Sequence, residues 1–463
     1  MLIYLFSLLI SCILFYEAPT SMNKGFMINC LTIVALNIAY FILMRSKNGY
    51  SVRKIYVRHS FIFIICFFIV FFQADLDYVL GFIDGSLKLL WIDNSIVCKS
   101  MALSTMALSS ILLGYSVFRN RETSIKNFSP ASYIYSTSNK KEICYAGYGL
   151  LVFYLLVVPR SYLYGGYNSG ADRGWANVIL VLLQALFIAV FALYCYEFRQ
   201  RSVRKNFFQE LKAPIILVLV YIGIVLITGR RTEAVRMALL LLIAYSYAMG
   251  RMANNKMILI ITISSAVIFS ATRVLRSGDT NEFRKSIEIV ADASSISPFT
   301  QELSSSVNTL HVAVSNFPER YNYTNGLTFF PNFFILVPGL DRFYQSNIRG
   351  AGVITNSADL ITNIEIGKEA GYGMGSSIVA DVYIAFGPIG VVIAFIILGI
   401  FIRYLEVGTF AMMKSPYFIV LSLGCCSQFM FACRGTVANL FLSWSYATLI
   451  IFFFSKRIKR SNV

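Results

Sequence analysis

The chain has 463 residues, of which 57% are hydrophobic and only 14% are charged, and its mean hydropathy is +0.67. Soluble domains carry about 25% charged residues. This composition therefore excludes a soluble protein and predicts a polytopic membrane protein. The net charge of +17 would suggest nucleic acid in a soluble protein, but in a membrane protein its placement decides its meaning. We expect no nucleic-acid partner.

Apolar segments joined by short polar loops predict an all-α protein with about 12 transmembrane helices, since roughly 20 apolar residues cross a bilayer as a helix. The first segment lacks the basic start and small-residue cleavage site of a removed signal peptide, so we interpret it as a retained helix. The predicted spans are 2–16, 26–44, 60–80, 95–118, 143–159, 177–198, 214–229, 234–250, 257–272, 376–403, 417–433 and 436–454.

One long stretch, 273–375, contains no apolar run of spanning length and predicts a large, partly helical loop. It divides the chain into a bundle of nine spans at 1–272, the loop, and spans ten to twelve with a basic tail at 376–463. Within the loop, 324–340 is apolar but too short to span and is broken by two prolines, which favours an interfacial or re-entrant piece.

The loop also carries the pattern of an amphipathic helix. Ser297-Pro298 is a typical helix start, and Pro318 ends the apolar repeat that follows. The repeat consists of Phe299, Leu303, Val307, Leu310 and Val314 at helical spacing. A helix with one such face is suited to lie on the outer surface of the membrane bundle.

The distribution of Lys and Arg predicts the orientation. Loops at one membrane face hold 23 of the 40 basic residues, and cytoplasmic loops are the ones enriched in Lys and Arg. This face includes both termini, so both are predicted to be cytoplasmic. The long loop then lies on the external side.

Disulfide, metal and cofactor sites are not indicated. All nine cysteines lie in or beside predicted spans without a CxxC motif, and the chain contains only His59 and His311. Asp75 and Asp77 close the third span, where they represent either a metal-binding pair or a solvated helix end. We predict no metal and no cofactor.

External arginines form the first candidate site. Arg230 and Arg231 lie in the short link before the eighth span, and Arg434 lies in the link between the last two spans. Arg273 and Arg276 follow the ninth span. Cations at a helix N-terminus oppose the macrodipole, so a bound anion would stabilise them, and guanidinium groups fit phosphate well. The alternative is that each arginine only extends to the membrane interface.

A second candidate site precedes and enters the tenth span. Alternating glycines at 371, 373 and 375 lead to the free amides of a helix N-terminus, an arrangement that can hold an anion or simply provide a flexible entry. Asp381 is an ionisable residue inside the span, which makes it a functional candidate. Glu369, Asp381 and His311 are the candidate general bases.

Two stretches resemble a known family. They are TGRRTEAVRMALLLL at 228–242 and GYGMGSSIVADVYIAFGPIGVVIAFIILGIFI at 371–402, and Arg434 followed by a final span is similar to the family's C-terminal pattern. Together with the many spans and one large external loop, they resemble the Wzy-type O-antigen polymerases of bacterial inner membranes.

The resemblance implies an enzyme that polymerises oligosaccharide repeat units on undecaprenyl pyrophosphate at the periplasmic face, without nucleotide sugars. Arg230, Arg231 and Arg434, supported by Arg273 and Arg276, would then bind pyrophosphate and glycan. Glu369, Asp381 or His311 would deprotonate the acceptor hydroxyl. Membrane lipid, a chain-length regulator and a flippase of the same pathway are the implied partners.

Two alternatives remain open from the sequence. An O-antigen ligase shares the architecture and its loop typically carries a functional His, which keeps His311 under consideration. A flippase or transporter for the lipid-linked unit belongs to a different class. Transporters place ionisable groups near the middle of the membrane and often have repeated halves. The centres of the predicted spans carry almost no charge and the sequence shows no internal repeat, which favours the enzyme.

Overall fold

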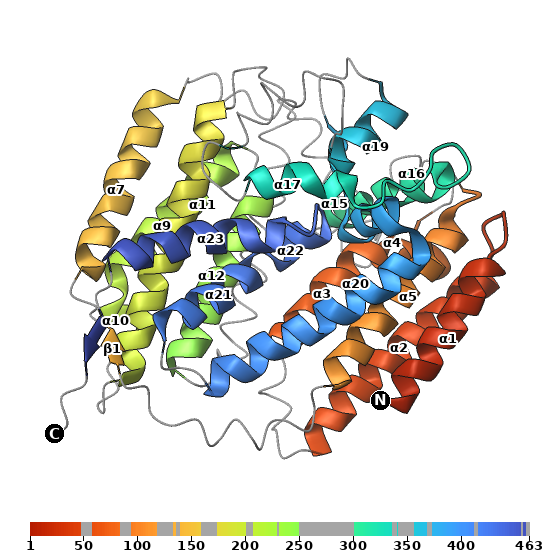
Figure 1. The fold of residues 1–463 in the computed structure, drawn as a ribbon, viewed down its shortest axis with the longest axis horizontal. Coiled ribbons are helices and arrows are strands. Elements are labelled where there is room, and N and C mark those ends of the chain that lie inside the picture. Colours follow the sequence, from red (N-terminus) through yellow and green to blue (C-terminus); the bar gives the residue numbers. More distant parts are fainter. Residues whose placement is uncertain are drawn as a thin grey trace. The chain divides into compact units, whose positions relative to one another are not determined.

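The structure is a computed structural model that describes residues 1–47, 58–83, 94–117, 133–135, 139–158, 174–200, 207–228, 231–249, 301–335, 340, 356–367, 373–411, 415–454 and 457–459. Helices account for nearly all of its regular structure (Figure 1). Two three-residue strands, β1 (Tyr133–Tyr135) and β2 (Arg457–Lys459), pair antiparallel. The predicted span 257–272 and about half of the predicted loop 273–375 lie outside the described residues.

Each predicted span within the described residues coincides with a helix or a broken pair. These elements are α1 (Leu2–Tyr16), α2 (Lys24–Lys47), α3 (His59–Phe71) with α4 (Gln73–Val79), α5 (Val97–Val117), α7 (Lys140–Val157), α9 (Gly174–Gln200), α10 (Phe207–Glu210) with α11 (Lys212–Ile227), α12 (Arg231–Met249), α20 (Ile378–Ala411), α21 (Pro416–Ser427) with α22 (Phe429–Cys433), and α23 (Asn439–Phe454).

Length and composition make five of the described helices able to cross a membrane, or six if α3 and α4, which meet at 56°, form one bent span. Four further apolar helices are shorter. The protein is therefore a multi-pass helical membrane protein. The count of about 12 spans stays a prediction.

Short helices follow within the predicted loop: α15 (Gln301–Ser304), η4 (Ser305–Val307), α16 (Asn308–Asn316), η5 (Leu327–Phe329), α17 (Phe330–Ile335) and α19 (Ser357–Glu365). Leu303, Val307, Leu310 and Val314 are buried as predicted, but Thr309, His311 and Val312 are buried too, so protein surrounds α16 and more than one of its faces is covered. The helix ends at Asn316, two residues before Pro318.

The described chain divides into two compact units. Unit 1 comprises Met1–Glu122, Ile287–Tyr404 and Met430–Asn439, and unit 2 comprises Thr123–Ser286, Leu405–Phe429 and Leu440–Val463. In unit 1, α1, α2 and α5 pack together, while α15 and η4 lie against the α3–α4 pair and α16 lies against α5 (Figure 1). In unit 2, α9 contacts α7, α11, α12 and α21.

Two glycines let α5 and α20 approach very closely within unit 1. A Cβ atom added to Gly114 would lie 2.1 Å from the carbonyl oxygen of Ile396, and one added to Gly399 would lie 2.0 Å from the carbonyl oxygen of Ile111. Small residues permit such backbone contact between membrane helices, where lipid supplies no hydrophobic drive for association. These glycines therefore allow the backbones of α5 and α20 to pack in direct contact.

A break near the start of α20 joins this helix to the loop. Gly387 has a φ of 67°, in the left-handed region that glycine tolerates. Pro388 has no N–H to donate to the carbonyl of Ile384, four residues earlier. The backbone N–H of Thr324 donates to that carbonyl at 2.9 Å. The segment containing Thr324 thus replaces a helix hydrogen bond that the sequence of α20 cannot make.

The glycine contact generates a stability prediction. Gly399→Ala should lower the midpoint of thermal unfolding of the detergent-purified protein by several degrees, because overpacking typically costs about 1–3 kcal/mol. Gly223→Ala on α11 is the matched control: a Cβ there has no neighbour within 4 Å, and alanine is the better helix former. Equal midpoints for the two variants would contradict the close α5–α20 contact.

Candidate functional site

Asp381 lies in the first turn of α20 and is fully buried, with 0% of its surface exposed. Its Oδ1 atom accepts a hydrogen bond from the Ser357 hydroxyl at 2.6 Å, and its Oδ2 atom accepts one from the backbone N–H of Val437 at 3.0 Å. A carboxylate near a helix N-terminus is also favoured by the macrodipole. Asp381 therefore joins the loop helix α19 to the link between α22 and α23.

That link contains Arg434. Its backbone N–H continues the last turn of α22 by donating to the carbonyl of Met430, and its side-chain Nε donates to the Ser306 hydroxyl at 2.7 Å. Gly435 follows, and a Cβ there would meet the Asn439 side chain at 2.2 Å. The guanidinium group is thus held by η4 on one side, while Asp381 fixes the link three residues later.

His311 lies on α16 and is 2% exposed, so its ring is part of the packing of that helix against α5 and α19. Arg231 is the first residue of α12. Arg230, Arg273, Arg276 and Glu369 lie outside the described residues. The structure thus brings Asp381 and the Arg434 link together and leaves the rest of the predicted set as sequence-based expectations.

The acidic pair of α4 does not form a solvated helix end. Asp75 and Asp77 are 2% and 1% exposed, because the pair lies where α4 packs beside α2 and α15. Among the described residues, no group of three or more His, Cys, Asp or Glu side chains is placed to hold a metal ion.

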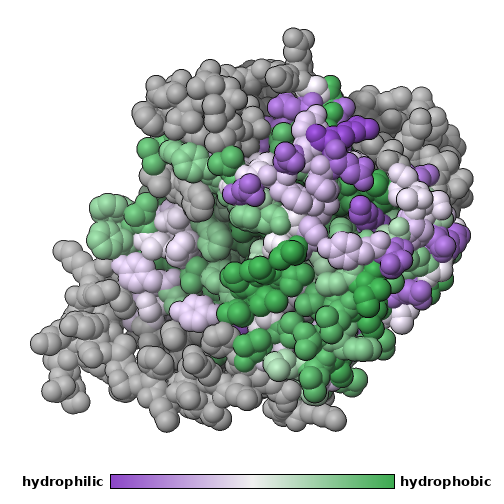
Figure 2. Space-filling model, turned by 45° about the vertical axis from the view of Figure 1, so that its right-hand side comes forward, coloured by the Kyte–Doolittle hydropathy of each residue, from purple (hydrophilic) through white to green (hydrophobic). Residues whose placement is uncertain are grey.

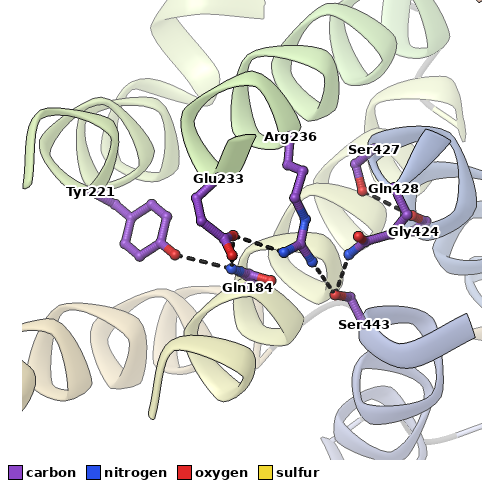
Figure 3. Close-up of polar contacts among 8 residues, drawn as sticks. All are labelled: Gln184, Tyr221, Glu233, Arg236, Gly424, Ser427, Gln428 and Ser443. Atoms are coloured by element: carbon purple, nitrogen blue, oxygen red, sulfur yellow. Dashed lines mark hydrogen bonds and ion pairs between the residues drawn. The ribbon is translucent and has the colours of Figure 1, made fainter. Parts of the chain in front are cut away.

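Unit 2 contains a buried polar network centred on Arg236 (Figure 3). The guanidinium Nη1 contacts Glu233 at 2.8 Å, and Nη2 donates to the Ser443 hydroxyl at 3.1 Å. Gln184 donates to Glu233 at 2.5 Å and to the Tyr221 hydroxyl at 3.1 Å. Side chains from α9, α11, α12 and α23 therefore meet at one ion pair.

Gln428 extends this network from the end of α21. Its amide nitrogen donates to the Ser443 hydroxyl at 2.5 Å (Figure 3). Arg236 is only 3% exposed, so its guanidinium group connects neighbouring helices through Glu233 and Ser443. Its position five residues into α12 anchors the helix that begins with Arg231.

Several residues of these clusters carry no sequence signal. Ser306, Ser357 and Ser443 are ordinary polar residues in or beside apolar helices, and only the fold shows that they meet charged groups. Gln184 lies mid-way in an apolar span. Its polar side chain inside an apolar span is the sequence feature that could have indicated a contact with other polar groups.

The family model described as O-antigen polysaccharide polymerase Wzy matches residues 1–462. The chain belongs to this family. The match spans both units and the predicted loop. The chain matches no curated protein and no solved structure in the corresponding comparisons. As a Wzy family member, the protein is a polysaccharide polymerase of the glycosyltransferase kind embedded in a membrane.

The hydrogen bonds of Asp381 generate a prediction for this Wzy protein. Asp381→Asn can still accept from Val437 N–H and donate to Ser357, whereas Asp381→Leu removes the acceptor of both, so that Val437 N–H loses its partner and Ser357 keeps only Ser376, at a cost of about 1–3 kcal/mol. We expect thermal unfolding of the leucine variant to occur well below that of the asparagine variant. Matching midpoints would show that the carboxylate does not hold α19 and the link.

The Arg236 network generates a second prediction. Glu233→Leu should cost about 3–5 kcal/mol, because it leaves a buried guanidinium without its carboxylate, and the double variant with Arg236→Leu should recover part of that loss. Thermal unfolding of both variants measures this. Glu142→Leu, which removes an exposed carboxylate from the first turn of α7, is the matched control. A double variant less stable than the single one would argue against the ion pair.

Proposed function

We propose that this protein polymerises oligosaccharide repeat units carried on undecaprenyl pyrophosphate, at the periplasmic face of the bacterial inner membrane. The match to the O-antigen polymerase family along residues 1–462 supports the reaction class, and the spanning helices support a membrane-embedded enzyme. The positive-inside distribution supports cytoplasmic termini and an external loop. The donor is already activated as a pyrophosphate ester, so no nucleotide sugar is needed.

The observation that carries the proposal is the held position of Arg434. Its Nε is bound to Ser306 of the predicted external loop, and its link is bound through Val437 to Asp381. A half-buried guanidinium fixed in this way is preorganised, so it need not reorganise when negative charge develops nearby. Transfer from pyrophosphate creates such charge on the leaving group.

Other arginines complete the proposed clamp. Arg231 is the first residue of α12, whose start is anchored by the Arg236 network in unit 2, and Arg230 precedes it in the sequence. Arg273 and Arg276 are supporting members from the predicted start of the loop. Guanidinium groups bind phosphate oxygens through two parallel N–H donors, so each of these arginines is suited to a phosphate group.

The reaction is a substitution at the anomeric carbon of the growing chain. The bond from this carbon to the pyrophosphate oxygen breaks, and a new bond forms to a hydroxyl oxygen of the incoming lipid-linked unit. The hydroxyl proton passes to a general base, and undecaprenyl pyrophosphate leaves with the bonding electron pair. The arginine clamp stabilises that leaving group.

Three residues are candidates for the base: Glu369, His311 and Asp381. The buried carboxylate of Asp381 already accepts two hydrogen bonds, which favours a positioning role over direct contact with substrate. We therefore assign the base to Glu369, from the glycine-rich entry to α20, with His311 as the second choice. Each needs only hydrogen-bond reach of the acceptor hydroxyl.

The proposed partners follow from the reaction. The substrate is a glycan on an isoprenoid pyrophosphate, and the enzyme shares it with a flippase that delivers the unit and a chain-length regulator. The apolar helices support a reaction at a lipid surface, where an isoprenoid chain would be held. Membrane lipid is therefore the surrounding solvent.

The clamp generates a functional prediction. Arg434→Ala and Arg231→Ala should each reduce polymer made in cells by at least about tenfold, since loss of one electrostatic stabiliser of a transition state costs roughly 10²–10³ in rate. Arg320→Ala is the control, because Arg320 is exposed and its side chain makes a long 3.4 Å contact with Asn316. If both clamp variants left chain length and amount unchanged, the clamp would be wrong.

The reaction class itself is tested by a gel profile of surface polysaccharide from cells lacking the protein, together with glycans held on undecaprenyl pyrophosphate. We expect lipid core capped with a single repeat unit, because polymerisation is lost and transfer to the core survives. Long polymer remaining on the carrier beside bare core would instead identify a ligase. Repeat units confined to the cytoplasmic leaflet would identify a flippase.

A further inference from the structure

Part of α20, between Phe386 and Ile397, exposes large apolar side chains. Phe386, Ile389, Ile393 and Ile397 are each between 49% and 70% exposed. Ile389, Ile393 and Ile397 recur every four residues and therefore share one helical face, and Phe386 is the exposed residue just before the break at Gly387. On a helix long and apolar enough to cross a membrane, an exposed stripe of this kind faces acyl chains.

The loop segment 324–330 attaches to the external end of this stripe. The ring of Phe329 stacks on Phe386 with centroids 5.8 Å apart and an interplanar angle of 18°. Gly326 lies so close that an added Cβ would be 2.9 Å from the Phe386 ring. Its backbone N–H also donates to the carbonyl of Ala385 at 3.3 Å. The segment is thus attached to α20 by aromatic stacking and by a backbone hydrogen bond.

Two large apolar side chains of this segment point outward beside the stripe. Leu327 and Phe330 are 51% and 46% exposed. Figure 2 shows that hydrophobic residues gather in one broad region of the face it draws, with hydrophilic residues gathered above it. Before this segment, Glu319 and Arg320 are exposed and charged. The chain therefore changes from polar to apolar between 319 and 330.

A second observation concerns membrane depth. The break at Pro388 frees the carbonyl of Ile384, and Thr324 N–H binds it. In water such a carbonyl would bind solvent, whereas in hydrocarbon an unsatisfied backbone group costs several kcal/mol. A loop that supplies the missing donor is expected where the break lies within the reach of the acyl chains.

We propose that Leu327 and Phe330 form a membrane-docking surface that inserts among the acyl chains of the external leaflet. Continuity with the lipid-facing stripe of α20 identifies the bilayer as the occupant. Asp381 lies five residues before Phe386, or about 7.5 Å along the helix axis. Docking therefore holds the Asp381–Arg434 region at the level of the lipid headgroups, where a pyrophosphate resides.

The test uses the full-length protein with Leu327→Cys, labelled with a bimane fluorophore and reconstituted in vesicles of phosphatidylethanolamine and phosphatidylglycerol without isoprenoid lipid. Arg320→Cys is the matched control on the same segment. Native thiols are buried or, for Cys12, half-buried, and unmodified protein gives their background. Phe330→Cys is a second reporter that guards against misfolding of the first.

A lipid carrying a nitroxide high on its acyl chain should quench the label at 327 severalfold more than the label at 320, and aqueous iodide should show the opposite order. Iodide quenching at 327 equal to that at 320 would overturn the proposal. Protection from both quenchers would show that protein covers the surface. Protection from iodide only after addition of undecaprenyl phosphate would assign the surface to the substrate chain. None of these outcomes depends on polymerase activity.

Discussion

The hydrogen bonds of the buried Asp381 carboxylate are the constraint on which the rest of unit 1 depends. A carboxylate without water must have its oxygens satisfied, and here the donors come from Ser357 on α19 and from Val437 in the link after α22. Segments about 25 and 55 residues away are thereby held against the first turn of one helix. Arg434 lies in the link after α22 that Asp381 holds. The hydrogen bonding that the buried carboxylate requires therefore also fixes the proposed pyrophosphate-binding arginine.

The break in α20 is a second place where the loop is bound to this helix. A proline inside a membrane helix frees a carbonyl, and in this protein the loop rather than a neighbouring helix satisfies it. Tyr383 adds a further tie, because its hydroxyl donates to the carbonyl of Phe317 at 2.9 Å. The loop is therefore fixed to the membrane part through backbone groups, which do not depend on the identity of most loop side chains.

In unit 2, apolar helices pack together although lipid supplies no hydrophobic drive for their association. A Cβ atom added to Gly424 on α21 would lie 2.9 Å from the Cβ atom of Trp444 on α23, so glycine allows these two helices to approach closely. The Arg236 network connects α9, α11, α12 and α23 through charged and amide groups. Buried ion pairs are sensitive to the loss of one partner. The start of α12, where Arg231 lies, is consequently a position that the bundle fixes firmly.

The sequence by itself determined the membrane class, the helical segments within the described residues and the apolar face of 303–314, because these follow from local periodicity and composition. It also indicated Asp381 and Arg434, because charge in or beside an apolar span is conspicuous. Only the tertiary structure decided that Asp381 holds the Arg434 link, that Arg236 pairs with Glu233, and that Asp75 and Asp77 are buried. Those outcomes depend on serines, amides and backbone groups far apart in the chain, whose meeting no local pattern encodes.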